Sequence, residues 1–219
     1  PELDEYFLGM GEKKFRSKQV YEWLWQKHAH SFEAMTNVSK ELRAKLNEAF
    51  DLPALTVNAT QYSEDGTIKS RFKTFDGHFV EGVLIPTELR KTACVSSQIG
   101  CSLSCKFCAT GYMDRKRNLH FDEIYDQVAI LNEQSEKMYG TGLTNIVYMG
   151  MGEPLLNLSN LVPALSLMME DYGFGLSKRR VTVSTSGVVP ALDKLGDMID
   201  VALAISLHAP NDKLRSEIM

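Results

Sequence analysis

The most restrictive feature of this sequence is an alternation of short apolar runs with longer amphipathic segments, which begins after Thr92. The apolar runs predict strands at residues 93–99, 145–149, 181–185 and 201–207. The segments between them, residues 122–138, 158–169 and 190–198, have the periodicity of amphipathic helices. Strands that alternate with helices form a parallel sheet with right-handed crossovers, either open or closed into a barrel. In both cases the ligand site lies at the carboxyl ends of the strands.

The first fifty residues predict two or three short helices. Ser17 and Ser39 are each followed by apolar residues at helical spacing, so we expect both to cap helices. Asp51-Leu52-Pro53 ends this pattern. Trp23 and Trp25 are expected to pack in the interior.

Residues 55–85 have a different pattern, in which β-branched and aromatic residues alternate with polar ones. Asp65-Gly66 and Asp76-Gly77 suit tight hairpin turns, so we expect a small antiparallel meander. The predicted organisation is a helical domain at residues 1–53, a β-rich connector at 54–91 and an α/β core at 92–219.

The composition is that of a globular protein. Of the 219 residues, 44% are hydrophobic and 24% are charged, which argues against a disordered or fibrous chain. The longest apolar run, residues 201–207, is far shorter than the roughly 20 residues of a membrane span, so no membrane association is expected. The first residues lack the features of a secretory signal, which favours the cytoplasm. Neither end has the character of a natural terminus, so we expect a longer protein.

Three of the four cysteines lie close together, as Cys101, Cys105 and Cys108, directly after the first predicted parallel strand. A reducing compartment and an odd number of thiols argue against disulfides and favour metal binding. A structural zinc ion would need a fourth ligand, such as His120, and usually a second pair of ligands. An iron-sulfur cluster normally takes four thiolates, so three would leave one iron open to a reacting ligand. A catalytic iron-sulfur cluster is therefore favoured, and a zinc-stabilised RNA-binding module without catalysis is the alternative.

The spacing C-x3-C-x2-C after the first strand of a β/α unit resembles the signature of radical S-adenosylmethionine enzymes. Further motifs resemble the bacterial dual-specificity adenine C2 methyltransferases of 23S rRNA and tRNA. These motifs are Cys94-Val-Ser-Ser-Gln-Ile-Gly-Cys101, Cys108-Ala-Thr-Gly, Arg117-Asn-Leu, Met149-Gly-Met-Gly-Glu-Pro-Leu-Leu-Asn157, Thr182-Val-Ser-Thr-Ser-Gly187 and Ser206-Leu-His-Ala-Pro-Asn211. The sequence departs from this family at Asp114-Arg115, where the family commonly has a glycine and an aromatic residue.

The resemblance implies a partial (β/α) radical-SAM barrel, preceded by a small helical RNA-binding domain and a short β-meander. It implies a [4Fe-4S] cluster held by Cys101, Cys105 and Cys108, with S-adenosyl-L-methionine on the open iron. Residues at or just beyond the ends of the second, third and fourth strands would bind the S-adenosylmethionine; they are Gly152, Glu153, Ser184, Ser206, Leu207 and His208. By their types alone, Gly152 and Glu153 suit an ordinary turn, and His208 suits a structural histidine.

Cys94 and Glu81 would have roles specific to this family. In the family, a C-terminal cysteine is methylated and then linked through its methyl group to the base. A second cysteine, at the position of Cys94, releases the product by forming a disulfide bond. A carboxylate at the position of Glu81 takes the proton from the base. By their types alone, Cys94 suits a buried packing position and Glu81 an exposed surface position.

The function that the resemblance implies is methylation of C2 of adenosine in 23S rRNA and tRNA, through a methylated cysteine and a 5'-deoxyadenosyl radical. An external electron donor of the flavodoxin type would reduce the cluster, and we expect a monomer. The nearest alternative is the C8-specific rRNA methyltransferase of the same superfamily. The net charge of −4 does not itself suggest a nucleic-acid partner. Three basic clusters are nevertheless candidate RNA contacts: Lys13, Lys14, Arg16 and Lys18; Arg115-Lys116-Arg117; and Lys178-Arg179-Arg180.

Overall fold

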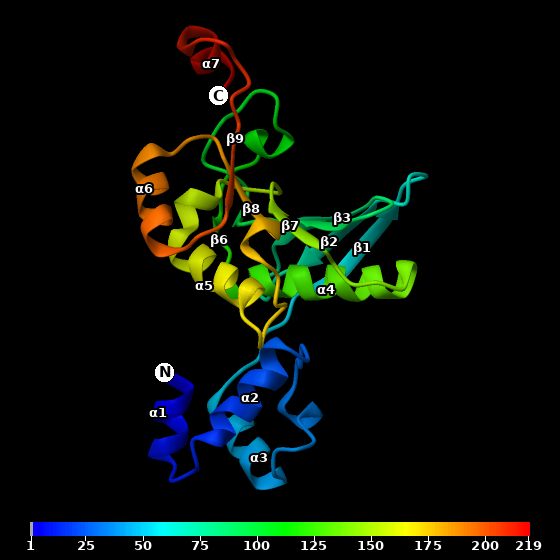
Figure 1. Cartoon of the computed structure of the whole chain (residues 1–219), viewed down its shortest axis with the longest axis vertical. Coiled ribbons are helices and arrows are strands. Elements are labelled where there is room, and N and C mark those ends of the chain that lie inside the picture. Colours follow the sequence, from blue (N-terminus) through cyan, green and yellow to red (C-terminus); the bar gives the residue numbers. More distant parts are fainter. Residues whose placement is uncertain (1) are drawn as a thin grey trace.

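The structure of the protein is a computed structural model that describes residues 2–219. A helical region, a β-meander and an α/β region follow one another along the chain (Figure 1). This mixed α/β architecture confirms the predicted fold class. Among residues 2–219, no helix is long and apolar enough to cross a membrane.

The helical region has its own small core. It consists of α1 (Glu2–Gly9), α2 (Phe15–Trp25), η1 (Phe32–Ala34) and α3 (Lys40–Ala49). Their buried side chains form one cluster: Phe7, Val20, Phe32, Met35, Val38, Leu42 and Leu46. Ser39 caps α3, as predicted, because its hydroxyl accepts a hydrogen bond from the Leu42 amide at 3.3 Å.

The prediction that Ser17 caps a helix is wrong. Helix α2 begins at Phe15, and Ser17 lies inside it as a buried residue. Its hydroxyl donates to Asp4 and to the Lys14 carbonyl. Ser17 therefore joins α2 to α1.

The meander consists of β1 (Thr56–Tyr62), β2 (Ile68–Lys73) and β3 (Phe79–Pro86), paired antiparallel. Gly66 and Gly77 adopt φ of +83° in the two connecting turns, where a side chain would be strained. The predicted hairpins are therefore present.

The meander continues directly into the α/β region. Strand β3 pairs antiparallel with β4 (Lys91–Cys94), and β4 then pairs parallel with β7 (Asn145–Tyr148). β8 (Val181–Thr185) and β9 (Ala202–Ile205) extend the parallel part. The result is one seven-stranded sheet in the order β1-β2-β3-β4-β7-β8-β9.

Helices pack on one face of this sheet. α4 (Phe121–Tyr139), α5 (Leu158–Met169, preceded by η3, Pro154–Asn157) and α6 (Val189–Met198) are the helices between the parallel strands. The main core joins buried strand residues, such as Ala93, Ile146 and Val183, to buried residues of α4 and α5. The remaining elements are η4 (Lys178–Arg180), which leads into β8, and α7 (Asp212–Ile218) at the end of the chain.

The strand predicted at residues 93–99 is interrupted. β4 ends at Cys94, and β5 (Gln98–Ile99) pairs instead with β6 (Arg117–Asn118) in a separate two-stranded ribbon. The Ser96 amide donates to the Gln127 side chain at 2.8 Å, and the same side chain donates back to the Ser96 carbonyl. These side-chain bonds replace ladder bonds, so the chain leaves the sheet there.

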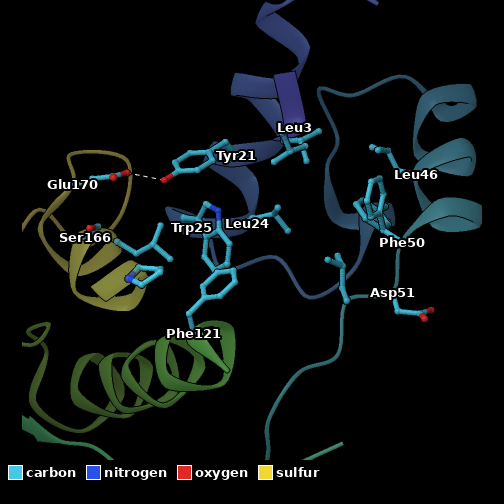
Figure 2. Close-up of a pocket in the computed structure, with 15 residues that line it drawn as sticks. Leu3, Tyr21, Leu24, Trp25, Leu46, Phe50, Asp51, Phe121, Ser166 and Glu170 are labelled. Atoms are coloured by element: carbon cyan, nitrogen blue, oxygen red, sulfur yellow. Dashed lines mark hydrogen bonds between the residues drawn. The ribbon is translucent and has the colours of Figure 1, made fainter. Parts of the chain in front are cut away.

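The helical region meets α4 and α5 across an apolar cavity of about 520 Å³ (Figure 2). Tyr21, Leu24 and Trp25 of α2 face Phe121 and Ser166. The Tyr21 hydroxyl donates to Glu170 at 2.6 Å, and the Tyr125 hydroxyl donates to the Trp25 carbonyl. Trp25 thus packs against the main core, as expected for an interior tryptophan.

Candidate active site

The three clustered cysteines lie on a loop, residues 100–116, that leaves and re-enters the fold through the β5–β6 ribbon. Two glycines permit close packing inside this loop. A Cβ atom on Gly100, whose φ is +74°, would lie 2.2 Å from the Asp114 carbonyl oxygen, and one on Gly111 would lie 2.5 Å from the Cys105 oxygen. The loop is therefore a folded unit that presents its thiols in a defined arrangement.

The departure from the family pattern at Asp114 does not disturb this arrangement. Asp114 forms a backbone bridge with Cys101, while its side chain is 93% exposed. The contact is thus made by the backbone and does not depend on the side chain at residue 114.

The cysteine loop and the carboxyl ends of the parallel strands line one cavity. Cys101, Cys105 and Cys108 lie on one side of it. The other lining residues that the sequence predicted are Gly152, Glu153, Ser184 and Ser206, which lie at or just beyond the carboxyl ends of β7, β8 and β9. Seven of the predicted site residues therefore meet at one place, whereas Glu81, Cys94, Leu207 and His208 do not line this cavity.

The donor set of this cavity fits an iron-sulfur cluster. All four cysteines are free. Burial raises the pKa of Cys101 and of Cys105, and the neighbouring thiols raise both further, so a cationic group is needed to hold these sulfurs together as thiolates.

A single ion fits the same cavity less well. Within residues 2–219, no three His, Cys, Asp or Glu side chains converge on a point where one metal ion could bind. A cluster does not need such convergence, because each cysteine binds a different iron. His120, the candidate fourth zinc ligand, instead begins α4 and exchanges capping hydrogen bonds with Glu123.

Glu153 is a buried carboxylate with only 4% of its surface exposed. One of its oxygens accepts from the Leu155 amide at 3.0 Å and the other from the Ser186 amide at 2.8 Å. Glu153 thus ties the loop after β7 to the loop after β8. Since each carboxylate oxygen can accept twice, both remain able to accept from a ligand in the cavity.

Gly150 and Gly152 allow two loops of the protein to approach each other. A Cβ atom on Gly150 would lie 2.7 Å from the Ser96 hydroxyl oxygen. One on Gly152, whose φ is +94°, would lie 2.5 Å from Cβ of Gln98. These glycines therefore make room for residues 96–98, and both also line the cavity.

Leu207 and His208 follow Ser206 but are exposed. His208 has a φ of +56°, which is unusual for a non-glycine residue. The centroid of its ring lies 4.2 Å from that of Phe107, which lies between Cys105 and Cys108 in the sequence. His208 therefore contacts the cysteine loop from outside the cavity.

Cys94 and Glu81 lie on neighbouring strands of the main sheet. Cys94 ends β4 opposite Val83, and Glu81 lies two residues from Val83 on the same face of β3. Burial raises the pKa of the Cys94 thiol. The Glu81 carboxylate forms an ion pair with the Lys69 ammonium group at 2.8 Å.

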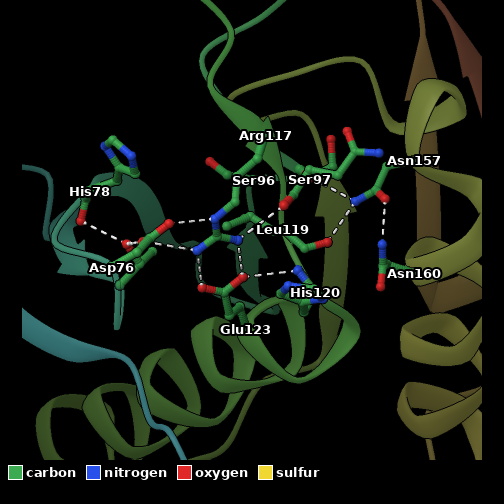
Figure 3. A network of polar contacts seen from close by, with 12 residues as sticks. Asp76, His78, Ser96, Ser97, Arg117, Leu119, His120, Glu123, Asn157 and Asn160 are labelled. Carbon is green, nitrogen blue, oxygen red and sulfur yellow. Dashed lines mark hydrogen bonds and ion pairs between the residues drawn. The ribbon is translucent and has the colours of Figure 1, made fainter.

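Arg117 connects the ribbon to the rest of the fold through a network of ion pairs (Figure 3). Its guanidinium group donates to both oxygens of Asp76, at 2.7 and 3.0 Å, and to both oxygens of Glu123, at 2.6 and 2.8 Å. It thereby joins the β2–β3 turn and the start of α4. Arg117 belongs to one of the basic clusters that the sequence offered as RNA contacts, but its guanidinium group is paired with carboxylates of the protein itself.

Three amide side chains fix the base of the cysteine loop, and the sequence analysis assigned none of them a role. Asn157 is 1% exposed and donates to the Ser97 and Leu119 carbonyls at 2.8 and 2.9 Å. Gln98 donates to Asn118 at 2.7 Å and accepts from the Glu153 amide at 2.9 Å. All three belong to quoted motifs, which was the available signal.

The basic run Lys178–Arg180 forms η4 and precedes β8, so it lies at the edge of the sheet opposite the cavity. The Lys178 ammonium group also pairs with Asp200. This candidate RNA contact therefore lies at the amino end of β8, away from the cavity at the carboxyl ends of the strands.

Comparison with known proteins agrees with this geometry. Residues 95–219 match the family model described as the radical SAM superfamily, and residues 1–52 match that of the ribosomal RNA large subunit methyltransferase N-terminal domain. The chain is 55% identical, over its whole length, to a probable dual-specificity RNA methyltransferase RlmN of Cytophaga hutchinsonii. It spans 60% of the length of that relative.

A solved structure has the same fold. The crystal structure of a radical SAM methyltransferase from Sphaerobacter thermophilus matches with a TM-score of 0.91 and 42% identity. The match covers the whole of this chain and 64% of that chain. The superfamily match includes the cysteine loop and every parallel strand after β4, and on this evidence the chain belongs to the radical SAM superfamily.

Proposed function

We propose that this chain belongs to a methyltransferase that modifies C2 of adenosine in 23S rRNA and tRNA. The observation that carries the proposal is the single cavity that joins three free cysteines to the ends of three parallel strands. The printed names of the relatives, an RNA methyltransferase and a radical SAM methyltransferase, support the reaction class.

Cys101, Cys105 and Cys108 would hold a [4Fe-4S] cluster in this cavity, and Gly152, Glu153, Ser184 and Ser206 would bind S-adenosylmethionine beside it. When bound, these groups supply the one-electron chemistry that an unactivated carbon such as adenine C2 requires. Glu153 would accept a hydrogen bond from the ammonium group of the cofactor. Leu207 and His208 would shape the rim of the site through the cysteine loop.

Glu81 and Cys94 would act on the substrate. The Glu81 carboxylate would take the proton that leaves the modified carbon. The Cys94 thiolate would attack the sulfur of a second cysteine, from outside residues 1–219, that is linked through a methylene group to the base. The S–S bond would form as the S–C bond breaks, and the released carbon would take up a proton to become the methyl group of the free product. The raised pKa of Cys94 keeps it a thiol at rest, so it would need a base to become reactive.

The remaining assignments follow from this reaction. We propose residues 1–53 as an RNA-binding accessory domain, 54–91 as a connector and 92–219 as the radical SAM core. Reduction of the cluster needs an external one-electron donor of the flavodoxin type. Free thiolate ligands favour the reducing cytoplasm. The monomeric state stays a prediction.

The direct test uses the full-length protein, reduced and supplied with S-adenosylmethionine and RNA, followed by mass spectrometry of the nucleosides. We expect 2-methyladenosine. A product of 8-methyladenosine would identify the sister activity, and the absence of any methylated adenosine would refute the proposal.

Cys94 has its own test in the same protein. Cys94→Ala is expected to keep the cluster and to accumulate protein covalently attached to RNA, visible on a denaturing gel with radiolabelled RNA. Cys101→Ala should show no adduct. Normal turnover by Cys94→Ala would show that Cys94 is a packing residue.

A further inference from the structure

The two faces of the β1–β3 meander differ sharply. One face carries Ile68, Phe72 and Leu84, which are at most 2% exposed and belong to the main core. Helix α4 packs on this side, where Gln134 bonds to Ser70. The other face carries the alternate residues of each strand and is open among the residues that the structure describes.

The open face is basic. Lys69, Arg71 and Lys73 alternate along β2, and all three side chains point away from the core. Only one acidic side chain of β1, β2 and β3, that of Glu81, lies among them, paired with Lys69. The face therefore keeps two unneutralised cations, Arg71 and Lys73.

The open face also carries an aromatic side chain. Phe79 lies directly opposite Lys73 and is 41% exposed. The Arg71 guanidinium group lies over its ring at 4.9 Å, held by a hydrogen bond from Nε to the Asn58 side chain at 2.8 Å. Aromatic rings and guanidinium planes on an exposed sheet are surfaces on which unpaired bases stack.

This face continues to Cys94 and Glu81, the two residues proposed to act on the substrate. Lys69 pairs with Val83, Val83 with Cys94, and Cys94 with Val147, so these residues form one row across the sheet. At about 4.8 Å per strand, Lys69 lies roughly 10 Å from Cys94 along that row. A nucleic-acid strand on the meander would therefore lead directly to Cys94 and Glu81.

We infer that the open face of the meander binds a single-stranded segment of the RNA substrate next to the target adenosine. Lys69, Arg71 and Lys73 contact its phosphates, and Phe79 with Arg71 stacks on a base. The inference rests on the proposed function and assigns a substrate-binding role to a region that the sequence suggested only as a connector. RNA is favoured over an acidic protein because the face combines cations with flat stacking groups.

The test measures binding of this 219-residue chain to a fluorescein-labelled 15-nucleotide single-stranded RNA, by fluorescence anisotropy from 50 to 300 mM NaCl. Each phosphate contact contributes about 0.7 to the slope of log affinity against log salt. Arg71→Ala with Lys73→Ala is expected to weaken binding at least about tenfold at 50 mM NaCl and to reduce the slope by about 1.4. Arg71→Lys with Lys73→Arg should keep most of the slope.

Two further variants separate the contributions. Phe79→Ala is expected to weaken binding by about five- to a hundredfold without changing the slope, because stacking releases no counterions. The double variant Lys178→Ala with Arg179→Ala removes the same number of charges next to the amino end of β8, away from the meander. It should leave affinity and slope unchanged. Circular dichroism should show the same fold for all variants, since the changed side chains are exposed.

Three results would overturn the inference. If Arg71→Ala with Lys73→Ala matches the unchanged protein in affinity and slope, while the full-length protein makes 2-methyladenosine, only the inference fails. If the unchanged protein binds no RNA, the result contradicts both this inference and the proposal that the substrate is RNA. Equal binding of a 15-residue polyglutamate, lost in the same variant, would make the face a general polyanion site.

Discussion

At the scale of single residues, Arg117 pairs with a buried carboxylate, Glu123, and with an exposed one, Asp76. The side chains of Arg117, Glu123 and Asp76 are 22%, 7% and 28% exposed. Removal of one partner from a buried ion pair leaves a charge without compensation, which costs about 3–5 kcal/mol. Arg117→Ala is therefore expected to lower the free energy of unfolding by that amount in urea titrations. Lys116→Ala, an exposed neighbour, should change it by less than about 0.5 kcal/mol.

The same network predicts a pH dependence. The hydrogen bonds from Arg117 hold the pKa of Asp76 well below its ordinary value of 3.8. A lowered carboxyl pKa stabilises the folded state above the unfolded pKa, and this contribution is lost as the pH falls. The stability difference between the unchanged protein and Arg117→Ala should therefore narrow as the pH falls from about 5 to 3. A difference that stays constant would contradict the role of Asp76.

Glu153 has a structural role besides its proposed role in cofactor binding. In Glu153→Gln, the side-chain NH2 group would face one of the two backbone N–H groups that donate to Glu153. Two donors cannot form a hydrogen bond with each other, so one of the two bonds would be lost. Without any cofactor, this change is expected to lower the free energy of unfolding by about 1–3 kcal/mol, measured by urea denaturation. Glu133→Gln, at an exposed surface pair, is the control. No loss of stability would leave cofactor binding as the only role of Glu153.

Cofactor binding by Glu153 is measured separately. Loss of one charge-assisted hydrogen bond should weaken S-adenosylmethionine binding by about ten- to a hundredfold. Titration calorimetry on the reconstituted protein under conditions where both variants are folded would show it. An unchanged dissociation constant would show that the role of Glu153 is purely structural.

At the scale of elements, the cysteine loop depends on the ribbon at its base. Asn157→Ala would leave the Ser97 and Leu119 carbonyls without their side-chain donor in the interior. We expect a loss of about 1–3 kcal/mol and faster hydrogen exchange of the Lys116 and Leu119 amides, which bond across the ribbon. Asn160→Ala, which loses only a bond to Asn157, should have a smaller effect. Equal exchange rates of these amides in both variants would show that Asn157 does not hold the ribbon in place.

Element boundaries show what the sequence could predict. The strand at residues 181–185 and the cap at Ser39 were predicted correctly, because both depend on local pattern. The run at 93–99 looked like one strand, yet side chains from α4 and η3 bind its backbone and divide it. Ser17 failed as a cap because Asp4, thirteen residues earlier, takes its hydroxyl. Errors arose where distant side chains competed with local preference.

In the candidate site too, local patterns were predictable and contacts with distant side chains were not. The cysteines and the residues at the strand ends were predictable, since motif spacing and topology bring them together. The roles of Gln98, Asn118 and Asn157 were not, because an amide side chain in a sequence gives no sign of which backbone groups it will satisfy.

At the scale of the whole molecule, the segment between the helical region and the meander is held by Asp126. This carboxylate is 9% exposed and accepts from the Leu55 amide at 2.9 Å. Burial raises its pKa from 3.8 to about 6. A raised carboxyl pKa destabilises the folded state as the pH rises from the unfolded to the folded value.

Asp126→Asn should therefore be more stable than the unchanged protein above pH 6, by up to about 3 kcal/mol, because the amide oxygen can still accept from Leu55 without carrying charge. The advantage should disappear near pH 4. Urea denaturation from pH 4 to 8 measures it, with Asp193→Asn, at an exposed site, as the control. An advantage that does not change with pH would show that Asp126 does not titrate in this range.

In the whole molecule, the meander and the parallel strands that lead to the cavity form one continuous sheet. The central claim is that Cys101, Cys105 and Cys108, and not Cys94, hold an iron-sulfur cluster. The most direct measurement is the iron and sulfide content of this chain and its four single Cys→Ala variants after anaerobic reconstitution. The account predicts about four irons per chain in the unchanged protein and in Cys94→Ala, and loss of the cluster in the other three. Equal loss in Cys94→Ala, or one tightly bound zinc with no iron-sulfur absorbance, would contradict it.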